Sequence, residues 1–468
     1  MPLILPGNVA SATAGAFEVA NSCRFNDDDS SYMHKTPGSG GNQKTWTFSA
    51  WVKRGNLGTR QGVINVNGSS NPYFFVEFIA ADNLQIQDYD GSQDTELTTT
   101  AKYRDVGAWY HICVAYDTTQ STDTNRIKLY VNGTQVTSFS TSTYCAEDFD
   151  SQMNSTNQLF IGQAGTQKFD GYMAEVCVVD GSQLAPTSFG EFDEDSPTIW
   201  KPIDVSGLTF GTNGFYLDFE DSSNLGNDAN GGTDLTEVNL AAADQATDTP
   251  TNNFCTLNPL DMYYINSSTL SEGNCKWTGS TQYGFGRATV GLTSGKWYFE
   301  VKMTNYDSAD SSIGITGAAS ASSTNWLGNG THQYGYLASA GDIYHGNSGT
   351  SHGDTYTEGD IIGCYFDLDN NKLYFSKNGT LQNSGTGHSI TAASSTTDGA
   401  YSPAFGDSCT SAGHVIQDFN FGACPAFAIS SGNTDGEYGN FEYSTTITGD
   451  GSSKTFKAIC TKNIAEFG

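Results

Sequence analysis

Alternation of apolar and polar residues dominates this chain and predicts β-strands throughout. Residues 45–54 read TWTFSAWVKR, with Trp46, Phe48 and Ala50 on one side of an extended segment, as in a half-buried strand. Comparable short segments recur up to about residue 180 and again from about residue 295 to residue 422. Many short strands between Gly-, Asn- and Ser-rich turns favour antiparallel β-sandwiches of jelly-roll type, so we expect an all-β fold with little helix.

The clearest single hairpin lies in residues 358–379, which read EGDIIGCYFDLDNNKLYFSKNG. Asn370 and Asn371 tolerate the positive φ of a tight turn. A two-residue loop at these asparagines predicts three cross-strand pairs, Asp369 with Lys372, Leu368 with Leu373 and Phe366 with Phe375. A looser hairpin is expected across residues 109–134, where the second strand also ends in Leu-Tyr followed by Asn-Gly-Thr.

Length and charge restrict the class of protein. A chain of 468 residues is too long for one core and suits two sandwich-sized domains. Hydrophobic residues make up 37% and aromatic residues 12%, so there is enough apolar material for packed cores. The chain carries 21 Lys and Arg against 51 Asp and Glu, a net charge of −30. Without a basic stripe it lacks the cations that drive phosphate-backbone binding, so nucleic acid is excluded as a partner.

Cysteine placement and the N-terminus bear on the cellular compartment. The ten cysteines show no C-x-x-C pair or zinc spacing, and we expect reduced, buried thiols. The opening MPLILPG lacks a cationic n-region and a long apolar core. We therefore expect synthesis in a host cytoplasm without a signal peptide, and no membrane insertion. Residues 1–20 form an N-terminal arm that either docks on a neighbour or frays.

Residues 21–185 resemble a laminin-G or pentraxin type lectin domain of the concanavalin A-like class. The resemblance rests on the segments FSAWVKR, WYHICVAYD, RIKLYVNGT and FDGYMAEVCVVDG. These are mostly core and turn positions, so they specify the fold more than the ligand. Residues 186–262 are richer in Pro, Asn, Asp and Gly, and we expect a long connector that lies along a domain surface or orders against a partner.

Residues 263–424 resemble a SPRY (B30.2-like) β-sandwich. The segments GKWYFEVKM, IGI, GDIIGCYFDLDNNKLYFSKNGT, YSPAF and FNFG occur in the order that this family shows. Residues 425–468 are expected to form a C-terminal tail packed on this second domain. In SPRY domains the loops at one end usually contact partners, which makes Trp326, Tyr334, Tyr344, His345 and the segment around His388 the candidate ligand contacts.

The connector segments GTNGFYLDFED and DTPTNNFCTLNPLD, with FKAICTKN after the second domain, resemble virion proteins of tailed bacteriophages, marine ones especially. The resemblance implies a non-enzymatic structural protein on the particle surface, most simply a tail fibre or appendage adhesin that recognises a host glycan or protein. Its partners would be other virion proteins and further copies of itself in a homo-oligomer. A head decoration protein is the first alternative.

Catalysis and metal binding remain as further hypotheses. Retaining glucanases of the concanavalin A-like class need two neighbouring carboxylates, and the nearest match is Glu191 with Asp193, in a segment followed by Pro197. Calcium needs clustered oxygen ligands. The candidates are Asp27 and Asp29, with Asp28 between them, in one turn and Asp88 with Asp90 in another, although a solvated acidic turn is the simpler explanation of both sets. No other cofactor is indicated.

Overall fold

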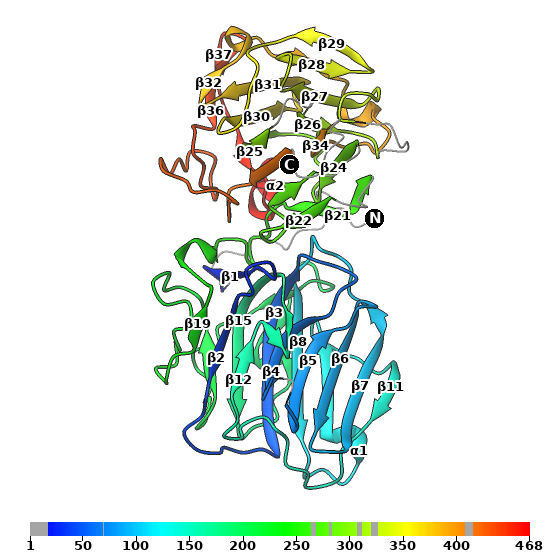
Figure 1. Ribbon diagram of the computed structural model, residues 1–468, viewed down its shortest axis with the longest axis vertical. Helices are drawn as coiled ribbons and strands as arrows, with labels where there is room; N and C mark the ends of the chain where they lie inside the picture. Colours follow the sequence, from blue (N-terminus) through cyan, green and yellow to red (C-terminus); the bar gives the residue numbers. More distant parts are fainter. Residues whose placement is uncertain are drawn as a thin grey trace. The chain divides into compact units, whose positions relative to one another are not determined.

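The computed structural model describes residues 17–68, 70–263, 268–279, 283–306, 311–319, 326–407 and 415–468. The described chain divides into two compact units, which we call the N-terminal unit, up to Thr251, and the C-terminal unit, Asn252–Gly468. Both units are built from antiparallel β-sheets (Figure 1). Residues 1–16 of the expected N-terminal arm lie outside the described residues.

The N-terminal unit contains two large sheets. The first, which we call the inner-strand sheet, runs in the order β10 (Thr134–Gln135), β9 (Ile127–Val131), β8 (Tyr110–Asp117), β3 (Thr45–Arg54), β15 (Gly171–Asp180), β1 (Ser22–Phe25) and β20 (Gln245–Ala246), with β18 (Phe215–Leu217) also paired to β15. The second, which we call the broad sheet, runs in the order β11 (Phe139–Thr143), β7 (Gln93–Lys102), β6 (Asn83–Tyr89), β5 (Tyr73–Phe78), β4 (Gln61–Val66), β12 (Leu159–Ile161), β2 (Tyr32–Lys35) and β19 (Thr236–Val238).

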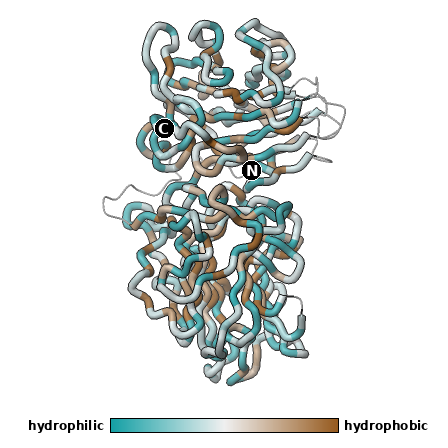
Figure 2. The backbone as a smooth tube through the Cα atoms, turned by 60° about the vertical axis from the view of Figure 1, so that its left-hand side comes forward, coloured by the Kyte–Doolittle hydropathy of each residue, from teal (hydrophilic) through white to brown (hydrophobic). Residues whose placement is uncertain are grey.

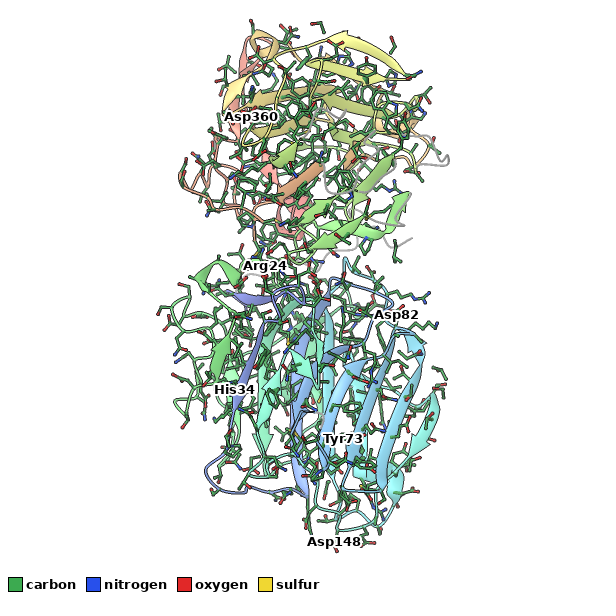
Figure 3. All side chains as sticks on the ribbon, in the orientation of Figure 1. Arg24, His34, Tyr73, Asp82, Asp148 and Asp360 are labelled. Atoms are coloured by element: carbon green, nitrogen blue, oxygen red, sulfur yellow. The ribbon has the colours of Figure 1, made fainter. Side chains whose placement is uncertain are left out.

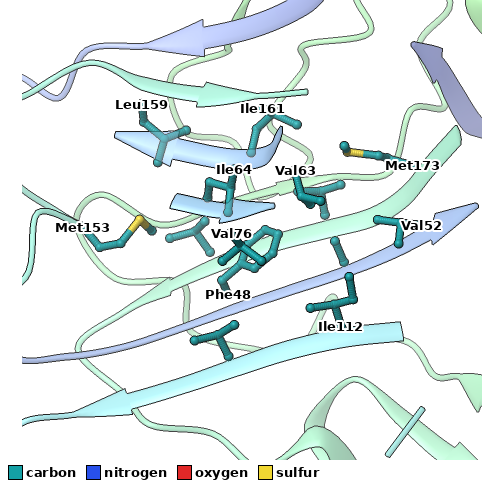
Figure 4. Close-up of a cluster of buried hydrophobic side chains, with 14 of the residues drawn as sticks. Phe48, Val52, Val63, Ile64, Val76, Ile112, Met153, Leu159, Ile161 and Met173 are labelled. Atoms are coloured by element: carbon teal, nitrogen blue, oxygen red, sulfur yellow. The ribbon is translucent and has the colours of Figure 1, made fainter. Parts of the chain in front are cut away.

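The core of the N-terminal unit lies between these two sheets. Phe48 and Val52 of β3 pack in the same cluster as Val76 of β5 (Figure 4). The alternation predicted for residues 45–54 is confirmed, because Trp46, Phe48 and Ala50 all belong to this cluster. Hydrophobic and hydrophilic positions interleave along the backbone of each unit (Figure 2), although central strands such as β3 and β15 are buried on both faces.

Residues 186–251 are not a separate connector. Leu217 of β18 pairs with Val176, and Ala246 of β20 pairs with Ser22, so this segment extends the inner-strand sheet. β19 likewise pairs with β2 at the end of the broad sheet. Each of these added strands is only two or three residues long. Strands this short carry no period-two signal, which explains why the sequence pattern indicated a connector.

The C-terminal unit is a second pair of sheets. One runs in the order β21 (Leu257–Tyr263), β24 (Gly284–Ala288), β34 (Ser402–Asp407), β26 (Ser311–Thr316), β27 (Gln333–Leu337), β28 (Asp342–His345) and β29 (Ser348–Ser351). The other runs in the order β22 (Thr269–Ser271), β23 (Lys276–Thr278), β35 (Val415–Asn420), β25 (Lys296–Tyr306), β30 (Ile361–Asp367), β31 (Lys372–Lys377) and β32 (Thr380–Leu381), with β33 (His388–Ser389) paired to β31 and β38 (Lys457–Ala458) paired to β25.

The remaining elements are short. The two-stranded sheets pair β13 (Gln163–Ala164) with β14 (Gln167–Lys168), β16 (Gly190–Phe192) with β17 (Trp200–Pro202), and β36 (Thr446–Gly449) with β37 (Ser452–Thr455); the α-helices are α1 (Asp123–Arg126) and α2 (Thr461–Phe467). Within the described ranges, no helix is both long enough and apolar enough to cross a membrane. All nine described cysteines are buried.

The hairpin of β30 and β31 exists, but its predicted register is wrong by two residues. Lys372 pairs with Asp367 rather than Asp369, so the loop contains four residues. The Asp367 carboxylate accepts a hydrogen bond from the Asn370 backbone N–H at 3.1 Å, and Asp369 instead pairs with Lys296 at 2.6 Å. A shift of two residues keeps every side chain on its predicted face, so the pattern could not distinguish the two registers.

The C-terminal segment packs on the second unit. β38 runs parallel to β25, with Ala458 beside Tyr298. Phe441 and Phe456 from this segment join a buried cluster with tyrosines of β25, β30 and β31. The segment therefore covers one face of the sheet that contains β25.

Candidate functional site

The predicted ligand contacts of the C-terminal unit gather around the β27–β28 hairpin. Gly335 pairs with Tyr344 across this hairpin. Tyr344 and His345 are consecutive residues of a strand, so their side chains point to opposite faces of the sheet. The hairpin thus divides the predicted residues into an outward group and an inward group.

Trp326 and Tyr344 form the outward group. Their rings meet edge to face with centroids 5.0 Å apart, and both side chains are half-buried. Gly328 makes this approach possible. Its φ is +116°, and a Cβ at this position would lie 2.6 Å from the Tyr344 Cβ. Leu327 anchors the same segment in a buried cluster with Phe285 and Ala404, so Trp326 is held in place by its neighbours.

Tyr334 and His345 form the inward group. Their rings stack at a centroid distance of 4.3 Å and an angle of 3°. Tyr334 is only 2% exposed, and its hydroxyl accepts a hydrogen bond from the Thr391 backbone N–H at 2.9 Å. His388 packs on the same ring, and burial, followed by His345 and Lys372, lowers the pKa of His388. Tyr334 is therefore a core residue rather than the surface contact that we expected.

Gln333 positions this site, and sequence reasoning missed it. Its side-chain oxygen accepts hydrogen bonds from the backbone N–H groups of Gly328 and Gly330 at 3.3 and 3.0 Å. At the tip of the next hairpin, β28–β29, Gly346 and Asn347 both have positive φ, and Asn347 donates its backbone N–H to the Gly328 carbonyl at 3.0 Å. The segment that carries Trp326 is thereby tied to the tip of the β28–β29 hairpin.

A second set of aromatic residues lies on the broad sheet of the N-terminal unit, on the face away from the core. Tyr73 stacks on Phe75 at 5.5 Å and on Tyr89 at 5.1 Å, with the ring planes 12° and 13° apart. Tyr73 and Tyr89 are half-buried, and the Tyr73 hydroxyl donates to Gln87 Oε1 at 3.1 Å. We call Tyr73, Phe75, Gln87 and Tyr89 the aromatic row. Figure 3 labels Tyr73 on this sheet.

The signal for the aromatic row was present in the sequence. Phe74, Val76 and Phe78 of β5 face the core, so the alternate positions Tyr73 and Phe75 must face outward. On β2 and β12 of the same sheet, Tyr32, His34 and Phe160 also contact one another, with ring centroids 5.9 to 6.2 Å apart. His34 is the second residue of this sheet labelled in Figure 3.

The predicted calcium residues fall in different environments. Asp88 is fully buried; it accepts a hydrogen bond from the Tyr116 hydroxyl at 3.2 Å, and burial raises its pKa to about 7. Asp90 is exposed and accepts a bond from the Ser92 backbone N–H at 3.3 Å. Asp88 therefore belongs to the core, whereas Asp90 caps a surface turn. Asp29 is exposed and bonds to Asn26, whereas Asp27 is half-buried.

Taken over the described residues alone, the structure shows no three His, Cys, Asp or Glu side chains that converge as metal ligands. Glu191 and Asp193, the candidate glycosidase carboxylates, both lie near the Lys201 ammonium, at 3.5 and 3.6 Å. Asp193 also accepts the backbone N–H of Ser196 at 2.9 Å, which is a turn-capping role. Both residues thus have structural partners.

One buried serine and histidine pair looks superficially catalytic. Ser49 Oγ lies 2.8 Å from His111 Nε2, and Trp200 Nε1 donates a hydrogen bond to His111 Nδ1 at 3.0 Å. Because Nδ1 accepts, Nε2 carries the proton and donates it to Ser49, the reverse of what a general base requires. His111 is fully buried, and burial lowers its pKa to about 3.

Comparison with known proteins agrees with this architecture. Residues 27–185 match the model of the concanavalin A-like lectin/glucanases superfamily, and residues 296–433 match the SPRY domain model. The chain therefore contains a concanavalin A-like domain followed by a SPRY domain. Together these domains indicate a binding or adhesion module.

Individual relatives match over a limited part of the chain. The chain is similar to Ran-binding protein 9 of Danio rerio, with 37% identity over 97 residues, which covers 20% of this chain and 16% of that protein. It is also similar to the dual specificity protein kinase splA of Dictyostelium discoideum, with 31% identity over 130 residues, 25% of this chain and 5% of that protein. The chain thus spans less than a fifth of the length of these curated relatives.

Among solved structures, the chain is similar to the SPRY domain of human HERC1. The sequence identity is 19% and the TM-score is 0.30, and the match covers 37% of this chain and 99% of that domain.

Proposed function

We propose that the protein is a non-enzymatic adhesin that binds a glycan across the aromatic row of its lectin-like domain. The observation that carries the proposal is the nearly parallel stack of Tyr73, Phe75 and Tyr89 on the face away from the core. Phe75 is only 7% exposed, so the half-buried rings of Tyr73 and Tyr89 are the part of the row that a ligand can reach. Aromatic rings contact the apolar faces of sugars, and neighbouring amides bond to sugar hydroxyls. Gln87, half-buried on β6 and opposite Phe75 in the sheet, supplies such an amide beside the rings.

The pair of Trp326 and Tyr344 on the SPRY domain supplies a second contact surface, for a host protein or a glycan. The observation that favours this surface is that Gly328 and Gln333 hold the segment that carries Trp326 in one position. A ring that is ordered before binding loses little conformational entropy when a ligand arrives. The B30.2-like character of this domain remains a proposal that rests on sequence resemblance.

The absence of enzymatic activity is part of the proposal. The Ser49 and His111 pair is buried, and His111 carries its proton on Nε2 and donates it to Ser49. Lys201 lies near both Glu191 and Asp193. These arrangements favour structural roles for the residues that could otherwise act as nucleophile or acid.

We further propose that the adhesin is displayed on a tailed bacteriophage particle as a homo-oligomeric appendage. The support is the sequence resemblance of the segments after each domain, and the net charge of −30, which suits a soluble particle surface. Several copies on one appendage would convert weak glycan contacts into stable attachment.

Immunogold labelling of purified particles with an antibody to this chain tests the virion assignment. Gold at the tail or its fibres is the expected result. Gold over the head would favour a head decoration protein over a host-recognition protein. Particles without gold would contradict the virion role. Glycan binding by the isolated protein is measured separately, so the glycan-binding and virion parts of the proposal can fail independently.

A further inference from the structure

Lys53 and Asp248 form an ion pair in which both side chains are buried. The Lys53 ammonium lies 2.6 Å from Asp248 Oδ2, and the two side chains are 1% and 2% exposed. Burying two charges is unfavourable, because the loss of hydration offsets much of their attraction. The pair of Lys296 and Asp369 has the same 2.6 Å separation, but its side chains are 30% and 44% exposed. An amine and a carboxyl are therefore held together away from solvent in the first pair and in contact with solvent in the second.

The fold brings Lys53 and Asp248 together from distant parts of the chain. Lys53 is on β3 and points away from the sandwich core, because its neighbour Val52 packs in that core. The Lys53 ammonium lies over Tyr172 of the adjoining strand β15, 5.8 Å from the ring centroid. Asp248 lies just after β20, and its backbone carbonyl accepts a hydrogen bond from Ser22 Oγ at 2.6 Å. The backbones of both residues are thus held in place.

Trp109 gives the two oxygens of the Asp248 carboxyl different partners. The Trp109 indole Nε1–H donates a hydrogen bond to Asp248 Oδ1 at 3.1 Å, whereas Oδ2 faces the Lys53 amine. A donor in this position stabilises the negative charge that develops on Oδ1 when a nucleophile attacks the carboxyl carbon. Trp109 is 8% exposed, so this donor is also largely shielded from water.

We propose that Lys53 and Asp248 join in an intramolecular isopeptide bond. A first proton moves from the Lys53 ammonium to Asp248 Oδ2 along their hydrogen bond, which replaces two buried charges by two neutral groups. The neutral Nζ then attacks the Asp248 carboxyl carbon, while Trp109 holds Oδ1. Nζ passes a second proton to Oδ2, which leaves as water, and a secondary amide remains. The step needs no oxidant, metal or further substrate.

The bond would fasten the end of the N-terminal unit to one of its central strands. β20 is only two residues long and pairs with β1 at the edge of the inner-strand sheet. A short edge strand opens easily, because few hydrogen bonds hold it. A covalent link from Asp248 to β3 would restrict the unfolded chain and thereby stabilise this unit. This modification goes beyond the proposed adhesin function and does not depend on it.

The intact mass of the purified full chain tests the proposal. The linked protein should be about 18 Da lighter than its sequence requires, because formation of one amide releases one water. Proteolytic mapping should recover a branched peptide that contains both Lys53 and Asp248. A succinimide at an Asp-Gly sequence such as Asp90-Gly91 also loses one water, but it hydrolyses in mild alkali and joins no second peptide. The mass difference should therefore survive treatment with mild alkali.

Three variants make the assignment specific. Lys53→Arg keeps a positive charge but has no nucleophilic amine, so its mass should equal that of its sequence. Asp248→Ala removes the carboxyl and should likewise show no loss of water. Lys296→Met is the matched control, since it removes an amine that lies at the same distance from a carboxylate; it should keep the full mass difference.

Two results would overturn the proposal. One is a wild-type mass equal to that of the sequence, which would mean that Lys53 and Asp248 remain an ion pair. The other is a loss of water that persists in both Lys53→Arg and Asp248→Ala. The wild-type mass and peptide map decide the question even if a variant does not fold. Because these measurements need neither glycan nor particles, their failure is distinct from failure of the adhesin proposal.

Discussion

The carboxylate of Glu300, on β25, accepts a hydrogen bond from the backbone N–H of Tyr443 at 2.7 Å. Glu300 is fully buried and also accepts the Glu442 backbone N–H at 2.9 Å. A single side chain in the middle of a sheet therefore fastens the C-terminal segment to the SPRY domain.

Replacing Glu300 by Ala should detach this segment locally. The change leaves two partly buried backbone N–H groups without their acceptor, which costs about 2–4 kcal/mol of unfolding free energy. Chemical denaturation measures the loss, and hydrogen exchange should show faster exchange at residues 436–445. The exposed Glu466→Ala is the control and should change stability by less than about 0.5 kcal/mol. Unchanged exchange in Glu300→Ala would mean that the tail is held elsewhere.

Asp88 should make the N-terminal unit less stable as the pH rises. Its folded pKa is about 7 against 3.8 as the ordinary value, so the folded state retains a proton that the unfolded state loses. Stability is therefore lost as the pH rises from about 4 to about 7, by about 4 kcal/mol for this group. Asp88→Asn should remove this part of the pH dependence. Urea denaturation at pH 4.5 and 7.5 measures the free energy of unfolding of both proteins. An equal change of this free energy with pH in wild type and variant would contradict the account.

Gly328→Ala should disorder the outward aromatic pair. The new Cβ would meet the Tyr344 Cβ at 2.6 Å at a φ that favours glycine, and we expect a loss of about 2–3 kcal/mol. Gly346→Ala is a matched control, because Gly346 also has positive φ but has open space around it; it should cost about 1 kcal/mol. Trp326 fluorescence should shift to the red only in Gly328→Ala. If both changes lowered stability and shifted the fluorescence equally, backbone strain at a positive φ would explain the loss without the contact between residue 328 and Tyr344.

Ser49 should resist a fluorophosphonate probe that labels activated serines. Ser49 is 1% exposed, and His111, with its pKa lowered to about 3, stays neutral across the physiological range and donates to the serine. We expect no labelling of the native protein by mass spectrometry, with an ordinary serine hydrolase labelled in parallel as the control. Stoichiometric labelling of Ser49 would revive the enzyme hypothesis.

Strand patterns made most of this fold predictable, because they depend on local alternation. The strand Thr45–Arg54 and its core-facing residues follow directly from TWTFSAWVKR. The register of β30 with β31 could not be predicted from the sequence, because the hydrogen bond from Asn370 to Asp367 sets the loop length. A period-two pattern is unchanged by a shift of two residues. The edge strands β18, β19 and β20 were too short to give any pattern.

The candidate site was predictable only in part, for a related reason. The sequence placed Trp326, Tyr344 and His345 in neighbouring loops. It did not predict that Tyr344 and His345 lie on opposite faces of the sheet, or that Tyr334 is buried. Gln333 was missed because its role depends on the backbone N–H groups that it meets in the folded chain, those of Gly328 and Gly330. Single-sequence patterns do not contain this information.

The most direct test of the adhesin account is binding of the full chain to an array of bacterial surface glycans. Wild-type protein should bind a restricted set of glycans, and Tyr73→Ala should weaken that binding about tenfold, because packing on an aromatic ring is worth about 0.5–1.5 kcal/mol and about 1.4 kcal/mol is a factor of ten in affinity. Tyr438→Ala, which removes a tyrosine that is 50% exposed, is the control and should bind as wild type does. Glycan binding that is unaffected by Tyr73→Ala, or no binding to any glycan, would contradict the account.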